Sequence, residues 1–136
     1  MKSSIEIISE LKTNGISIIE NYYDKKYCKK AINEIDKVLV EYKNKVQSDL
    51  KEGTSGDQRL FKIENASILA KKFQEDRFIN SILNGASNSK IESHFILGGK
   101  LTFKENETKN SGGGWHRDSD LEQFKVMVYL NDVEET

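Results

Sequence analysis

Apolar residues recur at three- and four-residue intervals between residues 24 and 46, the spacing of one face of an α-helix. Lysine and glutamate fill the positions between them. Asp24 precedes the first apolar residue, where a carboxylate can accept the free backbone N–H groups of a helix start. The pattern predicts a long amphipathic helix whose apolar stripe consists of Tyr27, Ala31, Ile32, Ile35, Val38, Leu39, Tyr42 and Val46.

Two shorter elements are expected before this helix. Residues 5–14 place Ile5, Ile8 and Leu11 on one helical face, and Gly15 follows where a glycine commonly ends a helix. Residues 15–20 are rich in isoleucine and predict a brief strand. The chain should therefore open with a helix, a strand and the long helix.

After the long helix the pattern changes from helical to alternating. Residues 59–63 could form a short strand, and residues 66–83 fit one or two helices. Apolar and polar residues alternate over residues 94–103, as in a half-buried strand or hairpin, and residues 124–130 (FKVMVYL) predict an apolar strand. We therefore expect an α+β fold of one domain, residues 1–136, in which residues 1–90 are mainly helical and residues 91–136 form the first strands of a sheet.

Composition narrows the class of protein. The 136 residues contain 21 Lys+Arg and 22 Asp+Glu, so the net charge of −1 provides no overall field toward nucleic acid or an acidic membrane, and neither is expected as a partner. The single cysteine, Cys28, cannot form an internal disulfide. No signal peptide and no apolar run of membrane-spanning length is recognisable, so a cytoplasmic location is predicted.

One pair of residues can carry metal chemistry. His116 and Asp118 are two positions apart, and alternate side chains of an extended segment point to the same side. A neutral nitrogen and an anionic oxygen are two of the three ligands in the facial triad of non-haem Fe(II) oxygenases. An isolated His-x-Asp pair is more often a surface hydrogen bond or a helix cap, so the neighbouring sequence decides between the two interpretations.

The neighbouring sequence is Gly112-Gly113-Gly114-Trp115-His116-Arg117-Asp118-Ser119, followed by the apolar run 124–130 and Asn131-Asp132-Val133. This order of a glycine-rich loop, W-H-x-D and an apolar strand resembles the phytanoyl-CoA dioxygenase family. Looser similarity extends to residues 15–23, 57–61 and 102–104.

The resemblance implies N-terminal helices packed on the first strands of a double-stranded β-helix, a cupin-like jelly roll. It also implies Fe(II) and 2-oxoglutarate as cofactors, oxidation of a small organic substrate, and His116 and Asp118 as metal ligands. Lys104 or Thr102 would face 2-oxoglutarate. The carboxylate of Asp118 favours hydroxylation, because related halogenases have a small residue there.

The chain departs from the family pattern after Asp118. The family has a further histidine ligand and an arginine that pairs with 2-oxoglutarate, but no His or Arg follows Asp118 here. His94 precedes the pair, and a core or edge position is expected for it. We therefore expect a truncated oxygenase fold, inactive alone, whose unpaired sheet edge could bind a second copy or another chain. The alternative is a non-catalytic interaction or structural domain derived from the same fold.

A protein kinase is a weaker alternative. His116-Arg117-Asp118 also matches the start of a kinase catalytic loop, but the position that should hold a metal-binding asparagine is Gln123. The chain also lacks the glycine-rich nucleotide loop and the D-F-G motif of kinases.

Overall fold

The fold begins with the first helix that the sequence predicts. In a computed structural model, which describes residues 2–45, 47–48, 58–87, 94–100 and 123–132, α1 spans Ser4–Asn14. Ser3 and Glu6 form a reciprocal capping box at its start, and Gly15 ends it with a left-handed φ of 74°. The helix and its glycine cap are confirmed.

The long helix α2 spans Lys25–Glu41. The side chain of Asp24 accepts a 2.6 Å hydrogen bond from the Tyr27 amide, so the predicted cap is confirmed. The helix ends sooner than its apolar stripe predicts and continues into a 3₁₀ turn, η1, at Lys43–Lys45. Its buried residues all belong to the predicted stripe: Ala31, Val38 and Leu39.

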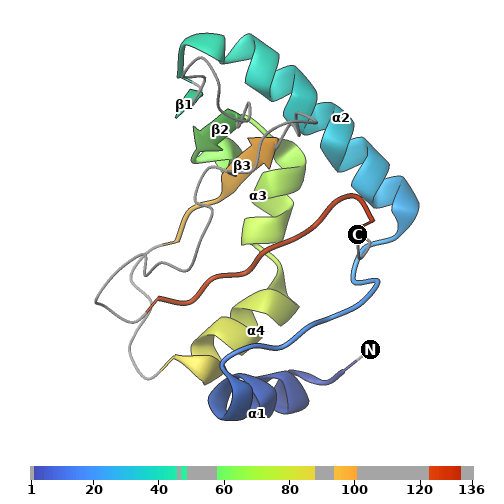
Figure 1. Ribbon diagram of the computed structural model, residues 1–136, viewed down its shortest axis with the longest axis vertical. Helices are drawn as coiled ribbons and strands as arrows, with labels where there is room; N and C mark the ends of the chain where they lie inside the picture. The colour runs from blue at the N-terminus through green and yellow to red at the C-terminus, as the bar shows by residue number, and fades with distance from the viewer. Residues whose placement is uncertain (1, 46, 49–57, 88–93, 101–122, 133–136) are drawn as a thin grey trace, which may run out of the picture.

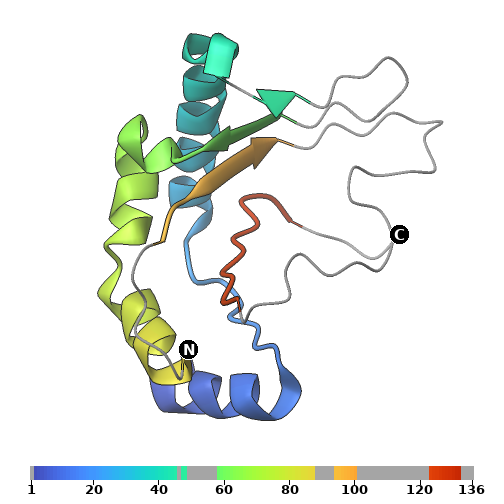
Figure 2. The ribbon, with the colours of Figure 1, turned by 90° about the vertical axis from the view of Figure 1, so that its left-hand side faces the viewer.

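Residues 66–83, for which the sequence predicts one or two helices, contribute to two helices. A 3₁₀ turn, η2 (Ile63–Asn65), leads into α3 (Ile68–Gln74), and α4 (Arg77–Ala86) follows after a two-residue break. α4 packs against α1 through buried isoleucines. Figures 1 and 2 show this pair of helices at the opposite end of the molecule from the sheet.

The strands of the described chain form one antiparallel sheet in the order β1-β2-β3. They span Gln47–Ser48, Gln58–Phe61 and Leu97–Lys100. β2 and β3 confirm strands within residues 59–63 and 94–103. α2 packs on β2, and the buried cluster between sheet and helices consists of Val38, Leu39, Leu60 and Ile63.

Two predicted strands are wrong. Residues 16–19 form no strand, and the side chains of Ile16 and Ile18 are exposed. Residues 124–130 run across the molecule without a strand assignment, and Met127 and Tyr129 are also exposed (Figure 1). β-branched and apolar residues favour strands because they pack on a neighbouring strand, and neither segment has such a neighbour among the described residues.

The sheet is not confined to the second part of the chain. β1 and β2 lie within residues 1–90, so the sheet draws its strands from both parts of the chain. Helices and strands pack together, with α2 against the sheet. The jelly roll itself remains a prediction.

Candidate functional site

The four residues expected at the metal and 2-oxoglutarate sites lie in one stretch of sequence. His116, Asp118, Lys104 and Thr102 all fall within residues 101–122, outside the described residues. The described chain reaches this stretch from the end of β3 and leaves it at Gln123. The predicted ligand pair therefore stays a prediction.

His94 lies in the described residues just before β3, with its side chain exposed. Its Nε2 is 3.4 Å from the Gln74 carbonyl oxygen, and the Gln74 side-chain amide donates a 3.1 Å hydrogen bond to the His94 carbonyl. The sequence left open a core or an edge position for His94, and its exposed side chain excludes the core. These contacts tie the chain before β3 to the end of α3, which is a structural role.

The described residues contain no cluster of side chains suited to a metal ion. Across residues 2–45, 47–48, 58–87, 94–100 and 123–132, no group of three or more His, Cys, Asp or Glu side chains is placed to hold one. Nor is any helix in these ranges long and apolar enough to cross a bilayer. A metal site of three such side chains would therefore have to draw on residues outside these ranges, such as the predicted pair in 101–122.

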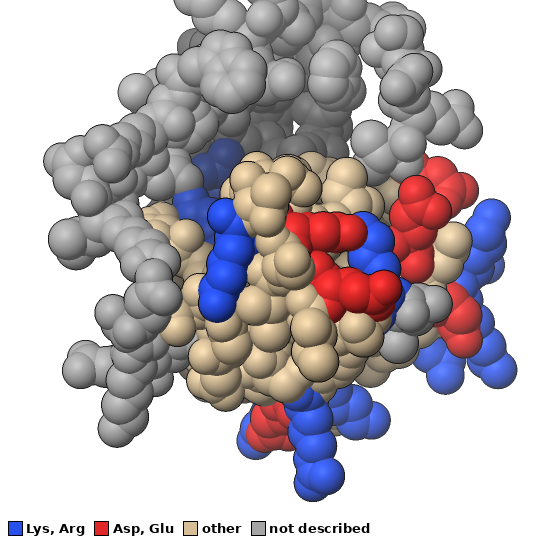
Figure 3. All heavy atoms as spheres, turned by 90° about the horizontal axis from the view of Figure 1, so that it is seen from below, with Lys and Arg blue, Asp and Glu red and all other residues tan. Residues whose placement is uncertain are grey.

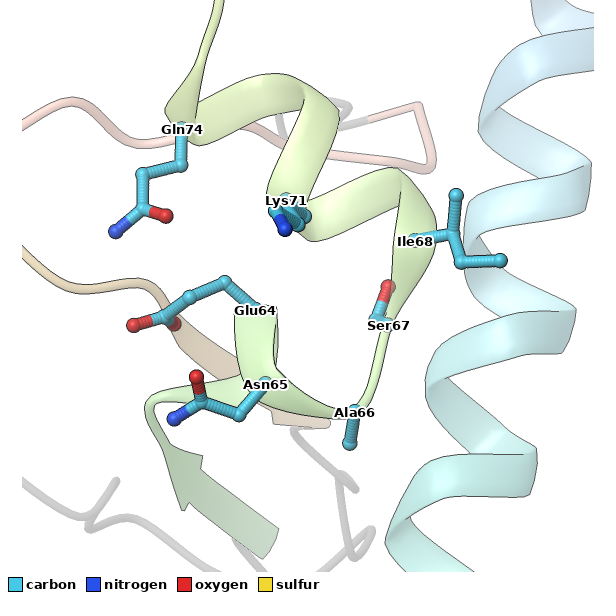
Figure 4. Close-up of a pocket in the computed structure, with 7 residues that line it drawn as sticks. All are labelled: Glu64, Asn65, Ala66, Ser67, Ile68, Lys71 and Gln74. Carbon is cyan, nitrogen blue, oxygen red and sulfur yellow. The ribbon is translucent and has the colours of Figure 1, made fainter.

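An open pocket of about 310 Å³ lies between η2 and α3 (Figure 4). Much of its polar lining already has partners within the protein. The carboxylate of Glu64 accepts a 3.0 Å hydrogen bond from the Ile96 amide, which holds the start of the β3 segment against η2. Gln74 contacts His94, as described above. The lining residues are Glu64, Asn65, Ala66, Ser67, Ile68, Lys71 and Gln74.

Ser67 is the residue of this pocket that most invites a catalytic interpretation, because its hydroxyl donates a 2.6 Å hydrogen bond to the Glu34 carboxylate. A serine beside a carboxylate can resemble a nucleophile and its base. Ser67 Oγ, however, also accepts a 3.0 Å hydrogen bond from the Ala70 amide, and the residue is 2 % exposed. Its hydroxyl thus serves as the N-terminal cap of α3 and is inaccessible to a substrate.

The environment of Glu34 agrees with this structural role. Burial alone raises the pKa of the Glu34 carboxyl, but hydrogen bonds from Ser67 and from the backbone amides of Leu69 and Ile68 outweigh it, and Lys72 adds a favourable charge. The net result is a pKa below the ordinary value. The carboxylate is therefore held in its charged form, which suits a hydrogen-bond acceptor rather than a proton donor.

A cluster of aromatic residues joins the segment before α2 to the junction of α3 and α4. The Tyr22 hydroxyl donates a 2.9 Å hydrogen bond to Asp76, whose other oxygen caps α4. Burial, the hydrogen bond and the charge of Asp76 raise the pKa of Tyr22 to about 12. The rings of Tyr23 and Tyr27 stack at 4.2 Å between centroids. Such a cluster fixes the packing of three segments and offers no nucleophile.

The sequence interpretation had not assigned Glu34, Ser67 or Asp76 any role. The sequence does contain a signal for Ser67 and Asp76, because each stands directly before a helix, where such residues commonly cap.

Compared with protein-family models, with curated proteins and with solved structures, the chain gives no match.

Proposed function

We propose that this chain contributes to an Fe(II)- and 2-oxoglutarate-dependent dioxygenase, in which His116 and Asp118 are metal ligands. The observation that carries the proposal is the run Trp115-His116-Arg117-Asp118 between three glycines and the apolar residues 124–130. A neutral imidazole and a carboxylate are a donor set that suits Fe(II). Glycines before the pair allow the backbone to approach a bound ion closely.

Each residue has a defined task in this proposal. His116 and Asp118 hold the metal, which supplies the oxidative decarboxylation of 2-oxoglutarate coupled to oxidation of a C–H bond. Lys104, with Thr102 beside it on the same side of an extended segment, neutralises the 2-oxoglutarate dianion. Arg117 alternates with the ligands and points away from the metal.

Two side chains are not a complete catalytic centre. No histidine or arginine follows Asp118 in the sequence, so the third protein ligand of the triad and the arginine partner of 2-oxoglutarate are not supplied after the pair. An ion held at two points binds weakly, and 2-oxoglutarate is not fixed in a single orientation. We therefore expect the 136-residue chain alone to bind metal and 2-oxoglutarate without turning the latter over.

Calorimetry of 2-oxoglutarate binding tests the proposal. In the absence of oxygen, 2-oxoglutarate should bind when Mn(II) is present as a stand-in for Fe(II), and should not bind without a metal. Lys104→Ala should weaken this binding. Lys100→Ala is the matched control, because Lys100 lies on β3 and forms a 2.7 Å ion pair with Asp36. Binding that is independent of metal, or weakened equally by both variants, would refute the assignment.

A turnover assay tests the expected inactivity separately. Succinate should not accumulate above background when the chain is given Fe(II), oxygen and 2-oxoglutarate. Fe(II)-dependent succinate formation that His116→Ala abolishes would show that the two ligands are sufficient, or that another residue such as His94 completes the site.

A further inference from the structure

The outward side of α2 carries a row of lysines. Ala31 and Val38 mark the buried side of this helix. On the opposite side the side chains of Lys26, Lys29, Lys30 and Lys37 are exposed, and we call these four residues the lysine face. Val40, which is 77 % exposed, continues the same side of the helix. The lysine face thus covers about three turns of a surface helix.

The placement of these charges opposes helix stability. Lys26 and Lys30 are four residues apart, as are Lys25 and Lys29, and like charges at this spacing repel. The Asp24 carboxylate caps the positive end of the helix dipole, and the first turn of α2 adds no further acidic residue. The repulsion between these lysines costs helix stability, and a local cost of this kind is typical of a functional surface.

Two lysines elsewhere in the described structure have close carboxylate partners. Lys2 pairs with Glu10, and Lys100 pairs with Asp36, each at 2.7 Å. Basic and acidic side chains also lie close to one another on the end of the molecule shown in Figure 3. These regions combine basic and acidic side chains, whereas the lysine face contains basic side chains alone.

Within the described ranges, no carboxylate lies within ion-pair distance of Lys26, Lys29 or Lys30. Lys25 approaches Asp132 at 3.8 Å, but both side chains are more than four-fifths exposed, so this contact is weak. The described structure therefore leaves a local concentration of positive charge on a protein whose net charge is −1.

We propose that the lysine face binds an anionic phospholipid surface. Lysine ammonium groups on a straight helix can approach a plane of headgroups together, and each contributes to attraction near such a surface. The face has no arginine for two-point phosphate recognition and no exposed aromatic residue on which a nucleic-acid base could stack. The apolar side of α2 is already buried in the core, so the helix lies on the headgroups without inserting.

Vesicle sedimentation with the full 136-residue chain tests the proposal. Binding should rise with the phosphatidylserine fraction of phosphatidylcholine vesicles and fall as salt is raised, because the attraction is short-ranged and screened. The triple variant Lys26→Gln/Lys29→Gln/Lys30→Gln should bind about 100-fold more weakly, from roughly a fivefold contribution per lysine. The matched control Lys12→Gln/Lys62→Gln/Lys71→Gln changes the net charge equally and should bind close to the wild type.

Urea unfolding of the same proteins provides a check that needs no vesicles. Removal of the repulsion along α2 should leave the first triple variant folded and at least as stable as the wild type. Equal loss of vesicle binding in both triple variants, or no binding to phosphatidylserine vesicles, would overturn the proposal. So would salt-sensitive binding of an oligonucleotide by a chain that ignores the vesicles, which would identify nucleic acid as the partner.

Discussion

Ser67 at the start of α3 donates a 2.6 Å hydrogen bond to Glu34 in the middle of α2. The same carboxylate oxygen accepts a 3.0 Å hydrogen bond from the Leu69 amide. A side chain of one helix thus satisfies free donors at the start of another, which fixes how the two helices pack. This contact, rather than a catalytic one, explains why a serine and a carboxylate meet beside the pocket.

Ser67→Ala should lower the free energy of unfolding by about 1–3 kcal/mol, because it removes the cap of α3 and the hydrogen bond to Glu34. Urea denaturation monitored by circular dichroism measures the change. Ser9→Ala on the exposed side of α1 is the control and should stay within about 0.5 kcal/mol of the wild type. Equal stability of the two variants would show that the Ser67 hydroxyl contributes nothing.

Glu34 should also make stability depend on acid pH. Its folded-state pKa lies below the ordinary value of 4.5, so its contribution is present above that value and is lost as the pH falls through the folded-state pKa. Glu34→Gln should therefore flatten the loss of stability between about pH 5 and pH 3. Glu41→Gln, an exposed change at the end of the same helix, should keep the wild-type slope. Identical slopes for both variants would contradict the assignment.

Gly98 on β3 should not tolerate a side chain. A Cβ at this position would overlap Ile63 Cδ1 and lie 3.2 Å from Ile63 Cγ2, and Ile63 is 1 % exposed and cannot move aside. Gly98→Ala should cost about 1–3 kcal/mol of stability. Gly99→Ala is the matched control, since its Cβ would meet one atom, the Gln58 carbonyl oxygen, at 3.8 Å. Thermal unfolding of the pair should give a lower Tm for Gly98→Ala alone.

Tyr22 should make stability depend on alkaline pH. Its pKa is raised to about 12 from the ordinary value of 10.0, so its contribution is complete below the unfolded-state value and is lost as the pH rises toward 12. Tyr22→Phe should cost about 1 kcal/mol at neutral pH through the lost bond to Asp76, and should weaken the decline above about pH 10. Tyr129→Phe, at an exposed position, should change neither quantity. Urea unfolding midpoints of the wild type and both variants, measured at neutral pH and above about pH 10, test these expectations.

Local signals in the sequence predicted helices well. The caps at Gly15 and Asp24 and the buried stripe of α2 depend on neighbouring residues or on the helical period, and both are visible in the sequence itself. Strands were predicted less well, because a strand needs a partner that the sequence does not identify. β2 and β3 pair with each other, whereas residues 16–19 and 124–130 have similar composition and no partner among the described residues.

Contacts between distant segments could not be predicted at all. Glu34 and Ser67 are 33 residues apart, and nothing in the periodicity of α2 distinguishes Glu34 from a solvent-exposed glutamate. The pairing of Gly98 with Leu60, which places the glycine over Ile63, likewise depends on strand register. The metal site, in contrast, was predicted from a local motif and a family resemblance. Its two residues, His116 and Asp118, lie outside the described residues.

Tryptophan fluorescence during a Co(II) titration tests the central claim most directly. Trp115 is the single tryptophan of the chain and precedes His116, so a paramagnetic ion held by His116 and Asp118 should quench it in a saturable way. His116→Ala and Asp118→Ala should each weaken this binding roughly tenfold or more, the scale on which even residues that merely support metal ligands act. His94→Ala, which alters the only other histidine, should quench like the wild type. If His116→Ala is quenched like the wild type, the pair does not bind metal and the proposed function is wrong.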